Sequence, residues 1–138
     1  MARKIIFISA VVLLTLLVGF ACARPKINMN PGKWEITTRT TMPGIPPRSV
    51  THTQCIKSDD LLPMSQDSKQ TCRVTDTTIS GNTVSWKISC GAGASGMSGS
   101  GEVTYEGDSM RGSMVFTMKA YGTTMKNTIA GRRIGDCD

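Results

Sequence analysis

The segment from Cys72 to Cys90 constrains the fold most strongly, because it has the pattern of a β-hairpin with a cysteine at each end. Apolar and polar residues alternate from 84 to 89, which gives one apolar face with the period of two that a strand requires. The run before the turn is rich in β-branched threonine, which suits a pleated surface. The Ser80-Gly81-Asn82 stretch supplies residues that tolerate the positive φ of a tight turn.

The register of this hairpin decides whether its two cysteines meet. A three-residue loop of Ser80, Gly81 and Asn82 places Cys72 opposite Cys90. A two-residue loop shifts the pairing by one residue and separates the two sulfur atoms. We therefore predict a three-residue loop and a disulfide between Cys72 and Cys90.

The beginning of the chain is typical of an export signal. Arg3 and Lys4 precede an uncharged run, residues 5–20, that is shorter than the roughly 20 residues of a membrane-spanning helix. Ala21 and Ala23 fit the small-x-small rule for signal cleavage. We predict that residues 1–23 are a secretory signal peptide and that residues 24–138 form a single β domain.

Two alternatives remain for the same segment. In the first, the signal is that of a bacterial lipoprotein and Cys22 carries the lipid anchor, although Phe20 fits poorly in the residues that precede such a cysteine. In the second, the segment is an uncleaved membrane anchor.

Composition favours an all-β domain with a small core. After residue 23 the only leucines are Leu61 and Leu62, threonine is abundant, and runs that favour helix are nearly absent. The net charge of +6 falls to +4 once Arg3 and Lys4 are removed with the signal. The remaining basic residues are scattered and are not interleaved with aromatic residues, so the sequence does not indicate nucleic-acid binding.

Four cysteines remain after cleavage: Cys55, Cys72, Cys90 and Cys137. In an exported small domain, four cysteines indicate two disulfides. The preferred pairing is Cys72–Cys90 with Cys55–Cys137, and the alternative is Cys55–Cys72 with Cys90–Cys137. No C-x-x-C pair is present, which argues against a zinc site.

The predicted strands form an antiparallel meander of about seven strands. Besides the two runs of the central hairpin, they cover residues 33–41, 50–56, 102–106, 110–119 and 123–131. Because little helix is available to cover an apolar face, we predict a sheet that curls into a barrel or half-barrel held by disulfides, with a two-sheet sandwich as the alternative.

The connections are predicted from proline, glycine and capping residues. Residues 42–47 are predicted as a loop because proline lacks the amide donor of a strand. Residues 58–62 are predicted as a capped helical turn. Residues 91–101 are predicted as a flexible glycine-serine loop. Their G-x-G-x-x-G pattern is not followed by a helix, so we interpret it as accidental.

One predicted strand face is rich in methionine. Met110, Met114, Phe116 and Met118 alternate along one strand, and Met125 lies on a face of the next. We interpret these side chains as core or as the lining of a cavity for a small apolar ligand. The alternative is that their thioethers bind Cu(I).

No arrangement of residues indicates catalysis. His52 is the only histidine and has no evident partner, and Glu102 and Glu106 fall on the predicted solvent face of their strand. We therefore predict no catalytic residues, no metal ligands among these side chains, no cofactor and no enzymatic activity.

The order and spacing of several motifs resemble the bacterial domain of unknown function 3617 family over nearly the whole chain after the signal. The motifs are PGKWEITTRTTMPGIPP (31–47), THTQC (51–55), SDDLLP (58–63), CRVTD (72–76), SGNTVSW (80–86), SGSGEVTYEGDSMRGSM (98–114) and GRRIGDC (131–137). The resemblance implies an exported, β-rich envelope protein, and it assigns no catalytic residue. Members of the family often carry a lipoprotein signal, which favours the alternative at Cys22.

The expected function is that of a non-enzymatic binding module in the periplasm or cell envelope. Its expected partner is a small apolar ligand or another envelope protein, and its only expected membrane contact is a lipid anchor at Cys22. The alternative function is a methionine-based periplasmic Cu(I)-binding protein.

Overall fold

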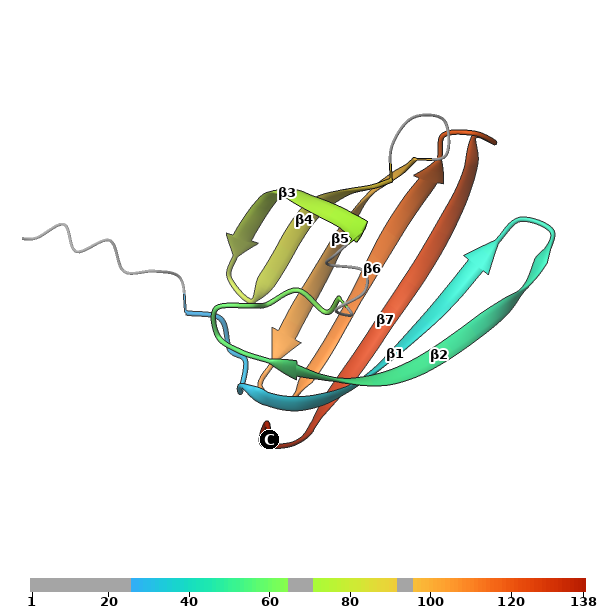
Figure 1. Ribbon diagram of the computed structural model, residues 1–138. Coiled ribbons are helices and arrows are strands. Elements are labelled where there is room, and N and C mark those ends of the chain that lie inside the picture. The colour runs from blue at the N-terminus through green and yellow to red at the C-terminus, as the bar shows by residue number, and fades with distance from the viewer. Residues whose placement is uncertain (1–25, 65–70, 92–95) are drawn as a thin grey trace, which may run out of the picture.

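A computed structural model describes residues 26–64, 71–91 and 96–138, which form one sheet of seven antiparallel strands (Figure 1). The strands are β1 Gly32–Met42, β2 Ile45–Ile56, β3 Cys72–Ser80, β4 Thr83–Cys90, β5 Met97–Glu106, β6 Ser109–Met118 and β7 Thr123–Gly135. The predicted all-β fold is confirmed. Within the described ranges, no helix has the length and apolar character needed to cross a membrane. The predicted signal peptide, Cys22 and most of the G-x-G-x-x-G stretch lie outside the described residues.

The order of the strands across the sheet is β2-β1-β7-β6-β5-β4-β3. The first and last strands therefore pair with each other inside the sheet, and β2 and β3 are left as its edges. The sheet curls so that its edge strand β3 passes in front of β4 and β5 in Figure 1. The result is a half-barrel that is open between two strands that are consecutive in sequence.

Residues 57–71, here called the crossing segment, connect the two edges of the half-barrel. The described part, residues 57–64, passes in front of the sheet (Figure 1). The Tyr105 hydroxyl donates a 2.6 Å hydrogen bond to the Leu61 carbonyl, and Gln54 Nε2 donates one of 3.2 Å to the Leu62 carbonyl. Met64 is buried in the core. Residues 57–64 of the crossing segment thus cover part of the concave face. The predicted helical turn at 58–62 is wrong, because this stretch makes only a tight turn before it extends over the core.

Both disulfides have the preferred pairing. Cys72 and Cys90 are register partners with Cα atoms 4.1 Å apart. Cys55 and Cys137 have Cα atoms 5.6 Å apart, and this bridge joins edge strand β2 to the tail that follows β7. Cys55 precedes the crossing segment and Cys72 follows it, so a disulfide anchors the chain at each end of this segment.

The turn of the central hairpin is shorter than predicted. Ser80 pairs with Thr83, so the loop has two residues, and Gly81 adopts a φ of 57° at its first position. A two-residue hairpin turn needs a positive φ at its first position, and glycine adopts this conformation most readily. The predicted three-residue loop is therefore wrong.

A β-bulge restores the cysteine register that the short turn would have shifted. Between the Thr75 and Thr78 pairs, β3 has two residues where β4 has only Trp86. The first bulge residue, Asp76, has a φ of 51°, a conformation that aspartate tolerates better than most residues. The shift from the turn and the shift from the bulge cancel, and Cys72 faces Cys90 as predicted.

Strand β5 begins at Met97, so the prediction of a loop as far as residue 101 is wrong. Gly99 and Gly101 lie on the concave face, where large side chains of neighbouring strands cover them. A Cβ atom on Gly101 would lie 2.7 Å from Trp86 Cζ2, and one on Gly99 would lie 2.8 Å from Phe116 Cδ1. Glycine is needed at these two strand positions because the Trp86 indole and the Phe116 ring occupy the space that a side chain would fill.

Replacement of Gly101 with valine is expected to lower the free energy of unfolding by about 1–3 kcal/mol, because the new side chain overlaps Trp86 and Met114. Urea denaturation followed by tryptophan fluorescence measures the change. Ser100→Val is the matched control on the outer face of the same strand, and we expect it to change stability by less than about 0.5 kcal/mol. Equal effects of the two substitutions would contradict this account of the glycines.

Strand β2 also begins earlier than predicted. Only Pro43 and Gly44 form the turn, and Pro46 and Pro47 lie inside the strand. Prolines are tolerated there because β2 is an edge strand, where a missing backbone N–H need not interrupt a ladder of hydrogen bonds.

The core lies on the concave face of the sheet. Trp34 is fully buried and meets Tyr105 edge to face, with ring centroids 5.9 Å apart. Burial raises the pKa of the Tyr105 phenol, and the negative charge of Asp60 adds to the increase. The phenol therefore stays protonated and keeps its hydrogen bond to the crossing segment at physiological pH.

Candidate functional site

Residues 26–31, here called the N-terminal segment, pack against one end of the half-barrel. Met29 forms an isolated parallel bridge with Gly107, and the backbone N–H of Asn30 donates to the Gly107 carbonyl at 3.1 Å. The backbone N–H of Asn28 donates to Asn82 Oδ1 at 3.0 Å. The N-terminal segment is thus joined to the β5–β6 turn and to the β3–β4 turn.

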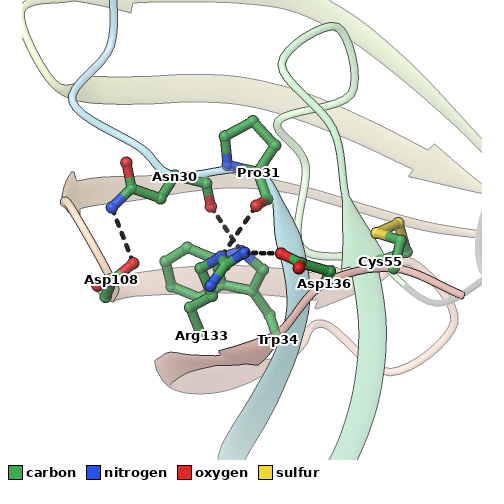
Figure 2. A network of polar contacts seen from close by, with 8 residues as sticks. Asn30, Pro31, Trp34, Cys55, Asp108, Arg133 and Asp136 are labelled. Carbon is green, nitrogen blue, oxygen red and sulfur yellow. Dashed lines mark hydrogen bonds and ion pairs between the residues drawn. A yellow bond between two sulfur atoms is a disulfide. The ribbon is translucent and has the colours of Figure 1, made fainter.

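A network of polar contacts fixes the end of this segment (Figure 2). Asn30 Nδ2 donates to Asp108 Oδ1 at 2.8 Å. The backbone carbonyl of Asn30 accepts a 3.3 Å hydrogen bond from Trp34 Nε1. Arg133 Nε donates to the Pro31 carbonyl at 2.9 Å, and its guanidinium pairs with Asp136. These contacts come from β1, β7 and the β5–β6 turn, so they hold the N-terminal segment in one position.

A pocket of about 450 Å³, here called the apolar pocket, lies between the N-terminal segment and the crossing segment. Most of its lining side chains are apolar, and Lys26 and Ser58 are the polar ones. The lining residues are Lys26, Ile27, Met29, Pro31, Ser58, Leu61 and Ile79. The volume falls in the range of about 300–1,000 Å³ that is usual for small-molecule sites.

The sequence did not reveal this pocket, because three separate segments form it. Ile27 and Met29 come from the N-terminal segment, Leu61 from the crossing segment and Ile79 from edge strand β3. The one available signal was the alternation of Ile27 and Met29 with polar residues, directly after the predicted cleavage site.

The methionine-rich residues predicted to line a cavity lie elsewhere on the concave face. Met110, Met114 and Phe116 are buried in the core, with exposed fractions of 1%, 7% and 7%. Met118 and Met125 are half-buried. None of the five lines the apolar pocket. That they line a ligand cavity remains a prediction.

The residues considered for catalysis are not brought together. Glu102 and Glu106 are exposed on the outer face, as predicted. His52 lies on β2, partly exposed, and its Nε2 has no hydrogen-bond partner in the described part of the protein. Across the same ranges, no group of three or more histidine, cysteine, aspartate or glutamate residues is placed to hold a metal ion.

Comparison with protein families places the chain in a known family. A family model with the description "Protein of unknown function (DUF3617)" matches residues 29–137. The matched range includes all seven strands, all four disulfide cysteines and the apolar side chain of Met29. No curated protein and no solved structure matches the chain.

Proposed function

Because the chain belongs to the DUF3617 family of proteins of unknown function, we propose a function from its geometry: it is a non-enzymatic binding module of the cell envelope that holds an apolar ligand. The observation that carries this proposal is the apolar pocket between the N-terminal segment and the crossing segment.

The walls of the apolar pocket are held in place before any ligand binds. Leu61 is fixed by the hydrogen bond from Tyr105, and Met29 by its bridge to Gly107. A preformed site loses less conformational entropy on binding than a flexible one. An apolar ligand would also remove from water the exposed part of Ile79, which has an exposed fraction of 37%.

The chemistry of the lining favours binding over catalysis. Among the described residues that line the pocket, Lys26 and Ser58 are the ones with functional groups of the kind used in catalysis, and none is a histidine or carboxylate that could activate the serine. The cationic end of Lys26, which is exposed, suits the polar end of a ligand whose body occupies the pocket.

Two features support an envelope location. The charged start and the apolar run of residues 5–20 are typical of export. The two disulfides need an oxidising compartment to form and persist.

Ile79→Asp is expected to weaken binding of the neutral fluorescent dye N-phenyl-1-naphthylamine by at least about tenfold, because the dye would have to displace the water that hydrates a carboxylate in the pocket wall. A titration that follows the increase in dye fluorescence measures the affinity. Ile45→Asp is the matched control, because Ile45 is an exposed strand isoleucine that does not line the pocket.

The proposal fails if the unmodified protein shows no saturable dye binding. It also fails if Ile79→Asp and Ile45→Asp weaken the affinity equally. Circular dichroism of both variants shows whether the fold is retained, so that a loss of affinity can be assigned to the pocket.

A further inference from the structure

Three methionines, Met97, Met118 and Met125, lie together at the end of the concave face where β4 ends and β7 begins. Met97 and Met118 are direct register partners across β5 and β6. Met125 is the partner of Phe116, two residues before Met118 in β6. Since register partners point to the same face, all three side chains lie on the concave face. We call these three residues the methionine cluster.

The spacing of the methionine cluster places the Met118 thioether within reach of the other two. Directly opposed residues of an antiparallel pair have Cβ atoms about 4.5–5.5 Å apart, which applies to Met97 and Met118. Diagonal neighbours lie about 7–8 Å apart, which applies to Met118 and Met125. Met118 lies between the other two residues, and methionine has three flexible torsions, so the Met118 sulfur can meet the sulfur of Met97 on one side and that of Met125 on the other.

The methionine cluster is accessible, unlike the other methionines of the same face. Met97, Met118 and Met125 are half-buried, whereas Met110 and Met114 are buried in the core. The N-terminal segment, which lines the apolar pocket, lies at the end of the sheet opposite to the methionine cluster. A ligand of the methionine cluster would therefore be independent of one in the apolar pocket.

Thioether sulfur is a soft and uncharged ligand, which selects Cu(I) over hard divalent cations. The ring of Phe116 lies on the same face beside Met118 and Met125, where it can add a cation–π contact. We propose that the methionine cluster binds one soft monovalent cation, Cu(I), through its thioethers, with Met118 as the central ligand. This site goes beyond the proposed binding of an apolar ligand.

Silver(I) is the probe for this site, because it prefers the same soft ligands and needs no reductant that would open the disulfides. The chain from Arg24 onward contains every described residue and, with both disulfides formed, has no free thiol. We expect one equivalent of Ag(I) to bind. We also expect it to shift the ¹³C ε-methyl resonances of Met97, Met118 and Met125 while those of Met110 and Met114 stay in place.

A triple variant is expected to weaken Ag(I) binding by at least about tenfold; it carries Met97→Leu, Met118→Leu and Met125→Leu. Loss of residues that only support metal ligands already weakens metal binding by about this factor, so loss of the ligands themselves should cost at least as much. Methionine-to-leucine exchange conserves volume, so the fold is retained. Met110→Leu is the control and should leave the affinity unchanged.

An excess of Cu(I), supplied as its acetonitrile complex without oxygen, is expected to displace Ag(I) from the unmodified protein. Three results would overturn the proposal: unchanged Ag(I) affinity in the triple variant, methyl shifts at Met29 or Met64 instead of the cluster, or failure of Cu(I) to displace Ag(I).

Discussion

Replacement of Cys55 and Cys137 with serine is expected to lower the free energy of unfolding by about 4–5 kcal/mol, because the lost disulfide closes a loop with a sequence separation of 82 residues. Both cysteines are exposed, so serine leaves no cavity in the core. Domains of this size have total stabilities of about 5–15 kcal/mol. The substitution therefore removes a large part of the stability of the fold.

The second disulfide provides the comparison. Cys72 and Cys90 are separated by 18 residues, and the loop-entropy relation gives about 3 kcal/mol for this bridge. Urea denaturation of the Cys55→Ser/Cys137→Ser protein and of a Cys72→Ala/Cys90→Ala protein measures both losses. A larger loss from the shorter loop would contradict the expected order and would show that local packing around Cys90 dominates.

Trp34→Ala is expected to lower the free energy of unfolding by about 3–5 kcal/mol, because it leaves a cavity in the core. The Trp34 side chain is fully buried against Tyr105, and its Nε1 donates to the Asn30 carbonyl. Since Asn30 belongs to the N-terminal segment, we also expect weaker binding of N-phenyl-1-naphthylamine to the apolar pocket. Urea denaturation and the dye titration measure the two effects.

Tyr121→Ala is the control for this prediction, because Tyr121 is an aromatic residue with an exposed fraction of 80%. We expect it to change the free energy of unfolding by less than about 0.5 kcal/mol and to leave dye binding unchanged. If Trp34→Ala unfolds the protein, Trp34→Phe retains most of the core volume and still removes the hydrogen bond to Asn30. Unaltered dye binding by a folded Trp34→Phe protein would contradict a role of Trp34 in positioning the N-terminal segment.

Alternation of apolar and polar residues was sufficient to predict most strands. In β4, Val84, Trp86 and Ile88 are buried while the residues between them are more exposed, as the period of two requires. Alternation failed where glycine or proline stood in a strand. Gly99 and Gly101 have no side chains to show a pattern, and their role depends on Phe116 and Trp86 of neighbouring strands. The prolines of β2 fit only because that strand is an edge.

The hairpin register shows how a correct pairing followed from an incorrect turn. Counting from Ser80 to Asn82 gave the right partners for Cys72 and Cys90, although the loop has two residues. The compensating bulge at Asp76 depends on a backbone conformation that few residues other than glycine adopt, and the sequence carries no clear signal for it.

The position of the apolar pocket could not be predicted, because it depends on the order of the strands. A meander pattern does not show that β1 pairs with β7 and that the opening lies between β2 and β3. This order makes the described residues 57–64 pass over the concave face and brings Leu61 near Ile27 and Ile79. The side chains that line the pocket are ordinary apolar residues, which carry no chemical motif.

The most direct test of a ligand site between the N-terminal segment and the crossing segment is an NMR measurement of nuclear Overhauser effects between N-phenyl-1-naphthylamine and the methyl groups of the oxidised protein. We expect contacts from the dye to the methyl groups of Ile27, Leu61 and Ile79, which lie on three separate segments and line one pocket. Contacts to Ile45 or Val115 instead, or no contacts at saturating dye, would contradict the proposed site.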